Sequence, residues 1–115
     1  MKKMFLLISL LGVSGFCFSQ QNPSITIVNN TGYTIWYVYI SETTIDSWGQ
    51  DRLADDEVLD NDASVSLQLP YPINVVNRYD IKLIDLDGDS YTKMDVLVSA
   101  NSRIVFTFDD YDEEE

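Results

Sequence analysis

From residue 24 to residue 108, short stretches rich in β-branched and aromatic residues alternate with groups of turn-forming residues. Val, Ile, Thr, Tyr, Phe and Trp suit the pleated, half-buried surface of a strand, whereas Gly, Pro, Asn and Asp favour turns. No stretch here carries apolar residues at a convincing helical spacing. The pattern predicts an all-β domain, a small antiparallel β-sandwich or open barrel of about six strands, at residues 24–29, 33–41, 63–69, 78–85, 90–99 and 103–108.

Two of these stretches predict more than a strand. Residues 33–41 (YTIWYVYIS) are apolar on both faces, which is typical of a central strand. Asp87-Gly88 predicts a tight hairpin turn, because glycine readily adopts the positive φ that such turns require. In the following stretch the alternation slips between Tyr91 and Met94, and a slip of one residue predicts a β-bulge.

The longest irregular segment runs from residue 42 to residue 62. It carries too many apolar residues for a free linker, so we expect a folded loop, with a short helical turn near residues 51–55, packed over one end of the sheet. By contrast, residues 109–115 (DDYDEEE) are almost entirely acidic, and such a run predicts a disordered tail.

The first 20 residues have the organisation of a secretory signal peptide. Lys2 and Lys3 precede an apolar run from residue 4 to residue 13, and a more polar segment ends at Ser19. The apolar run is shorter than the ~20 residues of a membrane span. Cleavage after Ser19 or Gln20 would leave a domain at 21–108, and the chain is expected to be secreted or periplasmic in a bacterium. Lipidation at Cys17 is the alternative, although Phe16 stands where a lipobox has a small residue.

The charge of the chain limits its partners. With 19 acidic and 7 basic residues, the formal net charge is −12. Such a chain repels phosphate backbones and anionic membrane surfaces, so nucleic acid is not an expected partner. Cations and basic protein surfaces remain compatible with it.

The acidic residues are expected to gather at one end of the domain. If successive strands run antiparallel, the 42–62 loop, the 85–89 hairpin and the 109–115 tail fall at the same end. These segments hold 17 of the 19 acids and one base, Arg52. The opposite end would then hold the nearly uncharged connections at residues 29–32, 70–77 and 100–102.

Within this acidic end, Asp85, Asp87 and Asp89 are the candidate metal ligands. Carboxylates at alternate positions of a turn suit Ca²⁺, which prefers hard oxygen ligands. The spacing is not that of an EF-hand, because Gly88 comes fourth in the loop and Val96 stands in place of the twelfth-position glutamate. The alternative is a tight hairpin with solvated acids, and Ca²⁺ is the one cofactor we consider.

The chain lacks the residues of several catalytic mechanisms. It has no histidine, and its single cysteine lies in the predicted signal segment, which excludes histidine-based triads and His- or Cys-ligated zinc. Its five glycines are spread along the chain and form no phosphate-binding loop. We therefore predict no catalytic residues and no enzymatic activity.

Aromatic side chains provide the candidate partner-binding residues. Trp36, Tyr37 and Tyr39 lie on one strand, where alternate residues face opposite sides, so at least one face can present aromatic rings outward. Packing on both sides of a central strand is the alternative. Trp48 in the long loop either contacts a partner or anchors that loop to the core.

A set of motifs spread over most of the mature chain resembles a group of uncharacterised small secreted bacterial β-sandwich proteins. The shared pattern is TGYTI…YIS…WGxDxL…YDI…DGDxYTK, carried here by residues 31–35, 39–41, 48–53, 79–81 and 87–93. The resemblance implies export and a compact β fold, and the group has no known function to transfer.

These observations together predict an exported, non-enzymatic binding domain for a protein or a cell-envelope component. A calcium-binding β module is the alternative. A structural or accessory subunit of an envelope assembly, which adds an edge strand to a partner, is a further alternative. An exposed aromatic patch would favour the binding domain, and a long, bare, uncharged edge strand would favour the subunit.

Overall fold

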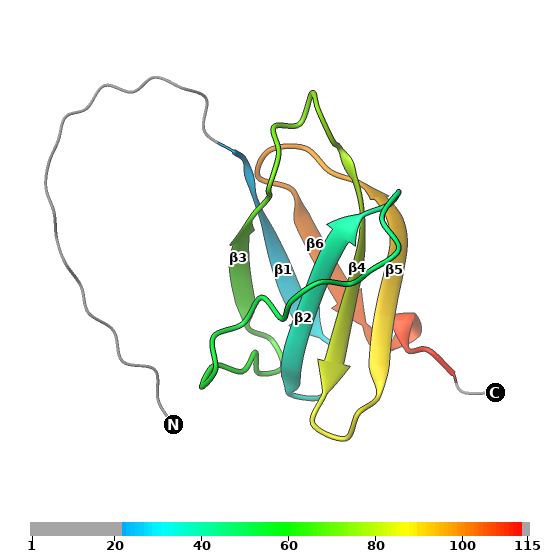
Figure 1. Cartoon of the computed structure of the whole chain (residues 1–115). Helices are drawn as coiled ribbons and strands as arrows, with labels where there is room; N and C mark the ends of the chain where they lie inside the picture. The colour runs from blue at the N-terminus through cyan, green and yellow to red at the C-terminus, as the bar shows by residue number, and fades with distance from the viewer. Residues whose placement is uncertain (1–21, 114–115) are drawn as a thin grey trace, which may run out of the picture.

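The computed structural model describes residues 22–113 and confirms the all-β fold class (Figure 1). The predicted signal segment lies outside the described residues. The strands are β1 (Ser24–Asn30), β2 (Ile35–Glu42), β3 (Ser64–Gln68), β4 (Arg78–Asp85), β5 (Ser90–Leu97) and β6 (Arg103–Thr107). They form two three-stranded sheets, with the strand orders β3-β1-β6 and β2-β4-β5.

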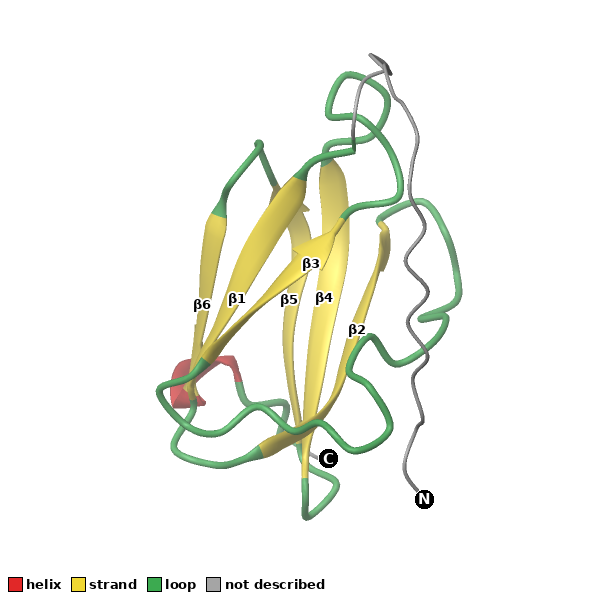
Figure 2. Ribbon diagram, turned by 90° about the vertical axis from the view of Figure 1, so that its left-hand side faces the viewer, coloured by secondary structure: helices red, strands yellow, loops and turns green. Residues whose placement is uncertain are grey.

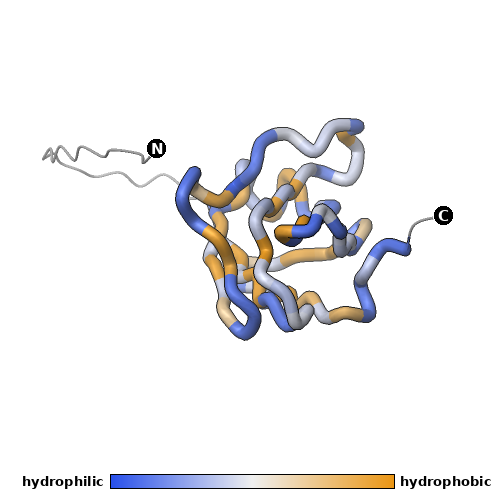
Figure 3. The backbone as a smooth tube through the Cα atoms, turned by 90° about the horizontal axis from the view of Figure 1, so that it is seen from below, coloured by the Kyte–Doolittle hydropathy of each residue, from blue (hydrophilic) through white to orange (hydrophobic). Residues whose placement is uncertain are grey.

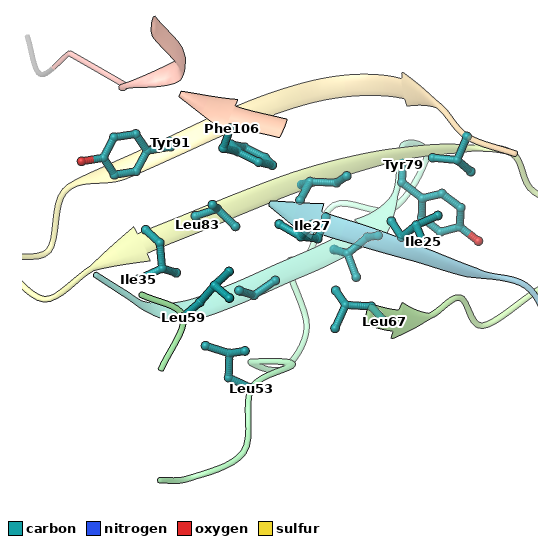
Figure 4. Packing of buried hydrophobic residues seen from close by; sticks show 14 of the residues in the cluster. Ile25, Ile27, Ile35, Leu53, Leu59, Leu67, Tyr79, Leu83, Tyr91 and Phe106 are labelled. Atoms are coloured by element: carbon teal, nitrogen blue, oxygen red, sulfur yellow. The ribbon is translucent and has the colours of Figure 1, made fainter. Parts of the chain in front are cut away.

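The two sheets face each other as the layers of a sandwich (Figure 2). The inward side chains follow the alternation of the sequence, because successive residues of a strand point to opposite faces. Figure 3, viewed from below, shows hydrophobic and hydrophilic stretches alternating along the backbone. Members of the core from both sheets lie together in Figure 4, among them Ile25, Ile27, Tyr79, Leu83 and Phe106, which are each 0% exposed.

One strand pair is parallel. β1 pairs with β3 in the antiparallel sense but with β6 in the parallel sense, with Ile27 opposite Ile104. β6 follows β5, which belongs to the other sheet, so β6 reaches the side of β1 by a crossover and not by a hairpin. The sandwich is therefore antiparallel everywhere except at this ladder.

The strand at residues 35–42 is an edge strand, and the prediction that it is central is wrong. β4 is the central strand of its sheet, and β2 lies beside it. The long loop returns along the outer edge of β2: the Arg52 N–H donates to the Val38 carbonyl oxygen at 2.7 Å, and Ile35 and Leu59 exchange two backbone hydrogen bonds of 2.9 Å. This cover explains how a strand with little charge can occupy an edge.

The course of this loop also corrects the expected acidic end. β2 and β3 point in the same direction in different sheets, so the connection between them runs the length of the domain (Figure 1). The Thr43 N–H donates to the Arg78 carbonyl oxygen near one end of the domain, and the Asp62 N–H donates to the Asn29 carbonyl oxygen near the other. The 85–89 hairpin and the C-terminal segment do share an end, but the loop acids are spread along one side, and the 29–32 turn lies at the end where the acids were expected.

The structure confirms the predicted bulge in β5. Between Tyr79 and Ile81 of β4, which pair with Val96 and Lys93, β5 contains one extra residue. Asp95 adopts φ 55° there, and its N–H donates to Asp80 Oδ1 at 2.7 Å. A buried carboxylate of the neighbouring strand therefore holds the bulge.

The chain after β6 differs from the expected disordered tail. Residues Phe108–Asp110 form a 3₁₀-helix, η1, with Thr107 as its N-cap. The Phe108 and Tyr111 rings stack at 5.0 Å, and Tyr111 also forms a bridge to Tyr91 of β5. Tyr111 packs against the core and gives the acidic segment apolar area to bury, which the charge of the run concealed. Residues 114–115 lie outside the described residues.

Candidate functional site

An irregularity in β2 sets the exposure of its aromatic residues. Ile35 pairs with Asp85 and Tyr37 pairs with Ile84, so Trp36 is an extra residue without an opposite partner. Because of this bulge, two consecutive aromatic side chains point away from the core, and Trp36 and Tyr37 are each 41% exposed. Regular alternation would have buried one of them.

The returning loop faces these two rings and is fixed to the domain. Asp51 Oδ1 accepts the N–H groups of Val38 and Leu53, both at 3.0 Å. Leu53 and Leu59 enter the core at 5% and 4% exposure. Between these anchors the chain makes one tight turn, closed by the hydrogen bond from the Glu57 N–H to the Ala54 carbonyl oxygen. The segment forms this turn instead of the helical turn expected near residues 51–55.

A groove of about 530 Å³ lies between β2 and the loop. Trp36 and Tyr37 form its aromatic wall, and the loop wall consists of Asp51, Ala54, Asp55, Asp56, Glu57 and Val58. Four carboxylates and no basic residue therefore line the groove. Its volume lies within the range of roughly 300–1,000 Å³ that is typical of small-molecule sites.

The carboxylates of the groove have different roles. Asp51 holds the loop to β2, as described above. Glu57 Oε1 accepts the Ala54 N–H at 2.9 Å, which leaves its second oxygen without a hydrogen bond. Asp56 is exposed and makes no hydrogen bond or ion pair within the described residues. Asp56 and Glu57 are thus the acids best placed to receive a donor from outside the protein.

The four predicted partner-binding residues do not form one platform. Trp36 and Tyr37 line the groove, and Tyr39 stacks on Tyr37 with the ring centroids 6.5 Å apart. Trp48 lies elsewhere, beside a smaller hollow of about 140 Å³, and Lys82 Nζ sits 5.4 Å from its ring centroid. The protein itself therefore already supplies a cation to Trp48.

The structure brings the three candidate metal ligands together. Asp85, Asp87 and Asp89 each have a ligand oxygen, and these atoms lie within 4.8 Å of one another. Asp85 is only 3% exposed, and its carboxylate accepts the N–H groups of Asp87 and Asp89 and the Tyr91 hydroxyl, each at 3.0 Å. These bonds are enough to explain Asp85 as a residue that closes the hairpin. Ca²⁺ needs six to eight oxygens, and the three aspartates offer one ligand atom each in this cluster.

Two buried tyrosines have raised pKa values. Burial raises the pKa of Tyr79 from 10.0 to about 12, with smaller contributions from Glu42 and Tyr71 and an opposing one from Arg52. Burial, and then the hydrogen bond to Asp85, raises the pKa of Tyr91 well above 10. Both phenols stay protonated at neutral pH. Only Tyr91 has a partner for its hydroxyl, because Tyr79 Oη has none within the described residues.

Sequence reasoning missed the acidic wall of the groove. Asp55, Asp56 and Glu57 are visible in the sequence as a run of acids. Their position opposite Trp36 depends on the loop returning along β2, and no local pattern encodes that path. The long apolar loop residues, Leu53 and Leu59, were the available signal that the segment is anchored to the sheet.

Comparisons with known proteins extend only to the fold. No protein-family model matches the chain, and no curated protein matches it. A protein from Eubacterium rectale, solved by NMR, is similar in structure with a TM-score of 0.57 and 14% sequence identity, over 81% of this chain and 84% of that one. Between residues 22 and 113, no helix has the length and hydropathy needed to cross a bilayer. The structural comparison therefore shows that the chain shares a fold with the Eubacterium rectale protein.

Proposed function

We propose that the protein is an exported, non-enzymatic binding module for a protein or a cell-envelope component, and that it binds through the groove between β2 and the 51–58 loop. The observation that carries this proposal is the exposure of Trp36 and Tyr37 on one wall of a groove of about 530 Å³. Exposed aromatic residues in a concave site are typical of binding surfaces, since they bury much apolar area on contact with a ligand.

Other features of the described chain favour binding over the subunit alternative. The edge of β2 is covered by the loop, and the start of β5 bonds to the C-terminal segment, where the Asp112 N–H donates to the Ser90 carbonyl oxygen. β3 is an uncharged edge strand but only five residues long, and Arg52 donates to the carbonyl oxygen of Gln68 in it at 2.7 Å. β2 therefore has no bare edge, β3 is too short for extended strand addition, and the start of β5 is covered.

The test uses the two tryptophans of the chain as separate reporters. The protein is labelled with 5-fluorotryptophan and titrated with basic, neutral and acidic peptides and with soluble cell-wall saccharides. A binding module should show saturable changes of the Trp36 fluorine resonance with at least one class, while the Trp48 resonance stays in place. If no class moves the Trp36 resonance, the groove is not a binding site and the proposal fails.

A further inference from the structure

We infer that the ligand of the groove is a basic peptide segment, with a lysine or arginine side chain that lies against Trp36 and extends its charge to Asp56 and Glu57. This inference rests on the proposed function and adds the chemistry of the partner. It follows from three features of the groove: the charge of its walls, the free face of Trp36, and the space between them.

The charge of the groove selects a cation. Its described lining contains four carboxylates and no base. An anionic ligand would meet repulsion from each of them, and a neutral ligand could donate hydrogen bonds to them but would leave their negative charges uncompensated. A lysine ammonium or an arginine guanidinium instead donates hydrogen bonds to the free oxygens of Asp56 and Glu57.

The aromatic wall favours the same group. The protein contains one comparable indole, Trp48, and the Lys82 ammonium already sits 5.4 Å from the centroid of that ring. Within the described residues, no lysine or arginine lies over the face of Trp36. Trp36 therefore has the exposure and the acidic surroundings of a cation–π site that the protein leaves for an external cation.

The dimensions of the groove fit a side chain that is apolar along its stem and charged at its tip. A lysine or arginine can lay its methylene groups on the rings of Trp36 and Tyr37 while its head reaches the loop wall. Val58 and Ala54 add apolar contact on the loop side. A bare metal ion would use the carboxylates but leave the aromatic wall without a role.

The experiment compares end-blocked octapeptides of alternating glycine and serine that carry lysine and arginine, or glutamine at the same positions. Binding is followed by the fluorine resonances of Trp36 and Trp48 and by the fluorescence anisotropy of a labelled peptide. We expect the basic peptide alone to shift Trp36 saturably. Trp36→Leu should weaken its binding about 3- to 30-fold.

A matched pair of double variants separates the groove from general charge attraction. Asp56→Asn with Glu57→Gln removes two charges from the groove and should weaken binding roughly 3- to 10-fold at low salt. Asp109→Asn with Glu113→Gln removes the same charges from the exposed C-terminal segment and should change the affinity less than about twofold.

Each contrary result has a distinct meaning. Equal losses in the two double variants would mean that the peptide is attracted only by net charge, which overturns the inference. A shift of Trp36 by the glutamine peptide or a saccharide, but not by the basic peptide, would overturn the inference and leave the proposed function in place. If no ligand shifts Trp36, both fail.

Discussion

The buried hydroxyl of Tyr79 gives the sharpest test of the structure. The side chain of Tyr79 is 0% exposed, and its Oη has no hydrogen-bond partner within the described residues. A buried hydroxyl without a partner loses its bonds to water and gains none, a penalty of about 1–3 kcal/mol. Tyr79→Phe keeps the ring and removes that group. We therefore expect the free energy of unfolding to rise by about 1 kcal/mol or more.

Tyr91 provides the isosteric counterpart with the opposite expectation. Its side chain is equally buried, but its hydroxyl donates to Asp85 Oδ2 at 3.0 Å. Hydrogen bonds to charged groups contribute about 1.5–3 kcal/mol, and their loss leaves Asp85 with one donor fewer in a buried position. Tyr91→Phe should therefore destabilise the domain by about 2 kcal/mol, although it makes the same chemical change as Tyr79→Phe.

Thermal and urea unfolding followed by circular dichroism would measure both changes. In a domain of this size, 1 kcal/mol corresponds to roughly 4–8 °C in the unfolding midpoint, so the two variants should differ by more than about 10 °C. Equal destabilisation by both substitutions would refute the reasoning. It would mean that Tyr79 Oη bonds to a partner in solution, as the Tyr91 hydroxyl bonds to Asp85.

Three further predictions concern alkaline pH, the loop and calcium. The raised pKa of Tyr79 means that the native state keeps a proton that the unfolded chain has released, so Tyr79 alone should lower the stability between pH 10 and 12 by about 1.4 kcal/mol per pH unit. Tyr91 adds to the fall in the same direction, and Tyr79→Phe should remove the Tyr79 part of the slope. Leu53→Ala should cost about 2–5 kcal/mol in urea unfolding, because Leu53 anchors the loop at 5% exposure; a loss below about 0.5 kcal/mol would show that the anchor is dispensable. Melts with EDTA, and with about 1 mM CaCl₂ or MgCl₂, should give equally small shifts for the two metals. A calcium-specific rise on the order of ten degrees, abolished by Asp87→Asn, would instead support the calcium-binding alternative.

Most of the fold was predictable because its signals are local. The alternation of residues 63–69 placed Leu67 and Leu69 in the core, where they are 5% and 1% exposed. The slip before Met94 located the bulge of β5 within two residues of Asp95. The alternation of side chains between the two faces of a strand is a local property. The inward residues and the bulge are therefore predictable whichever way the strands are arranged in the sheets.

The sequence identified aromatic residues of the candidate site, but it did not predict their exposure or their position opposite the acids. The exposure of Trp36 and Tyr37 was an open alternative in the sequence, and burial on both sides was the other. Whether these side chains are exposed or buried depends on the bulge at Trp36. The sequence of this strand shows no slip in its alternation of apolar and polar residues that would reveal the bulge. The acids of the opposite wall were equally visible, but their distance from Trp36 along the chain gave no indication of contact.

The sequence by itself determined the strands, their inward faces, the hairpin at Gly88 and the excess of negative charge, since each of these follows from residue type and local spacing. The tertiary structure decided which strands are edges, which pair is parallel and where the acids lie. Those features depend on how the two sheets pair across long separations, and in particular on β2 and β3 running in the same direction. That direction sends the 42–62 loop along β2 and places an acidic wall opposite an aromatic one, because the chain has no shorter way back to the start of β3.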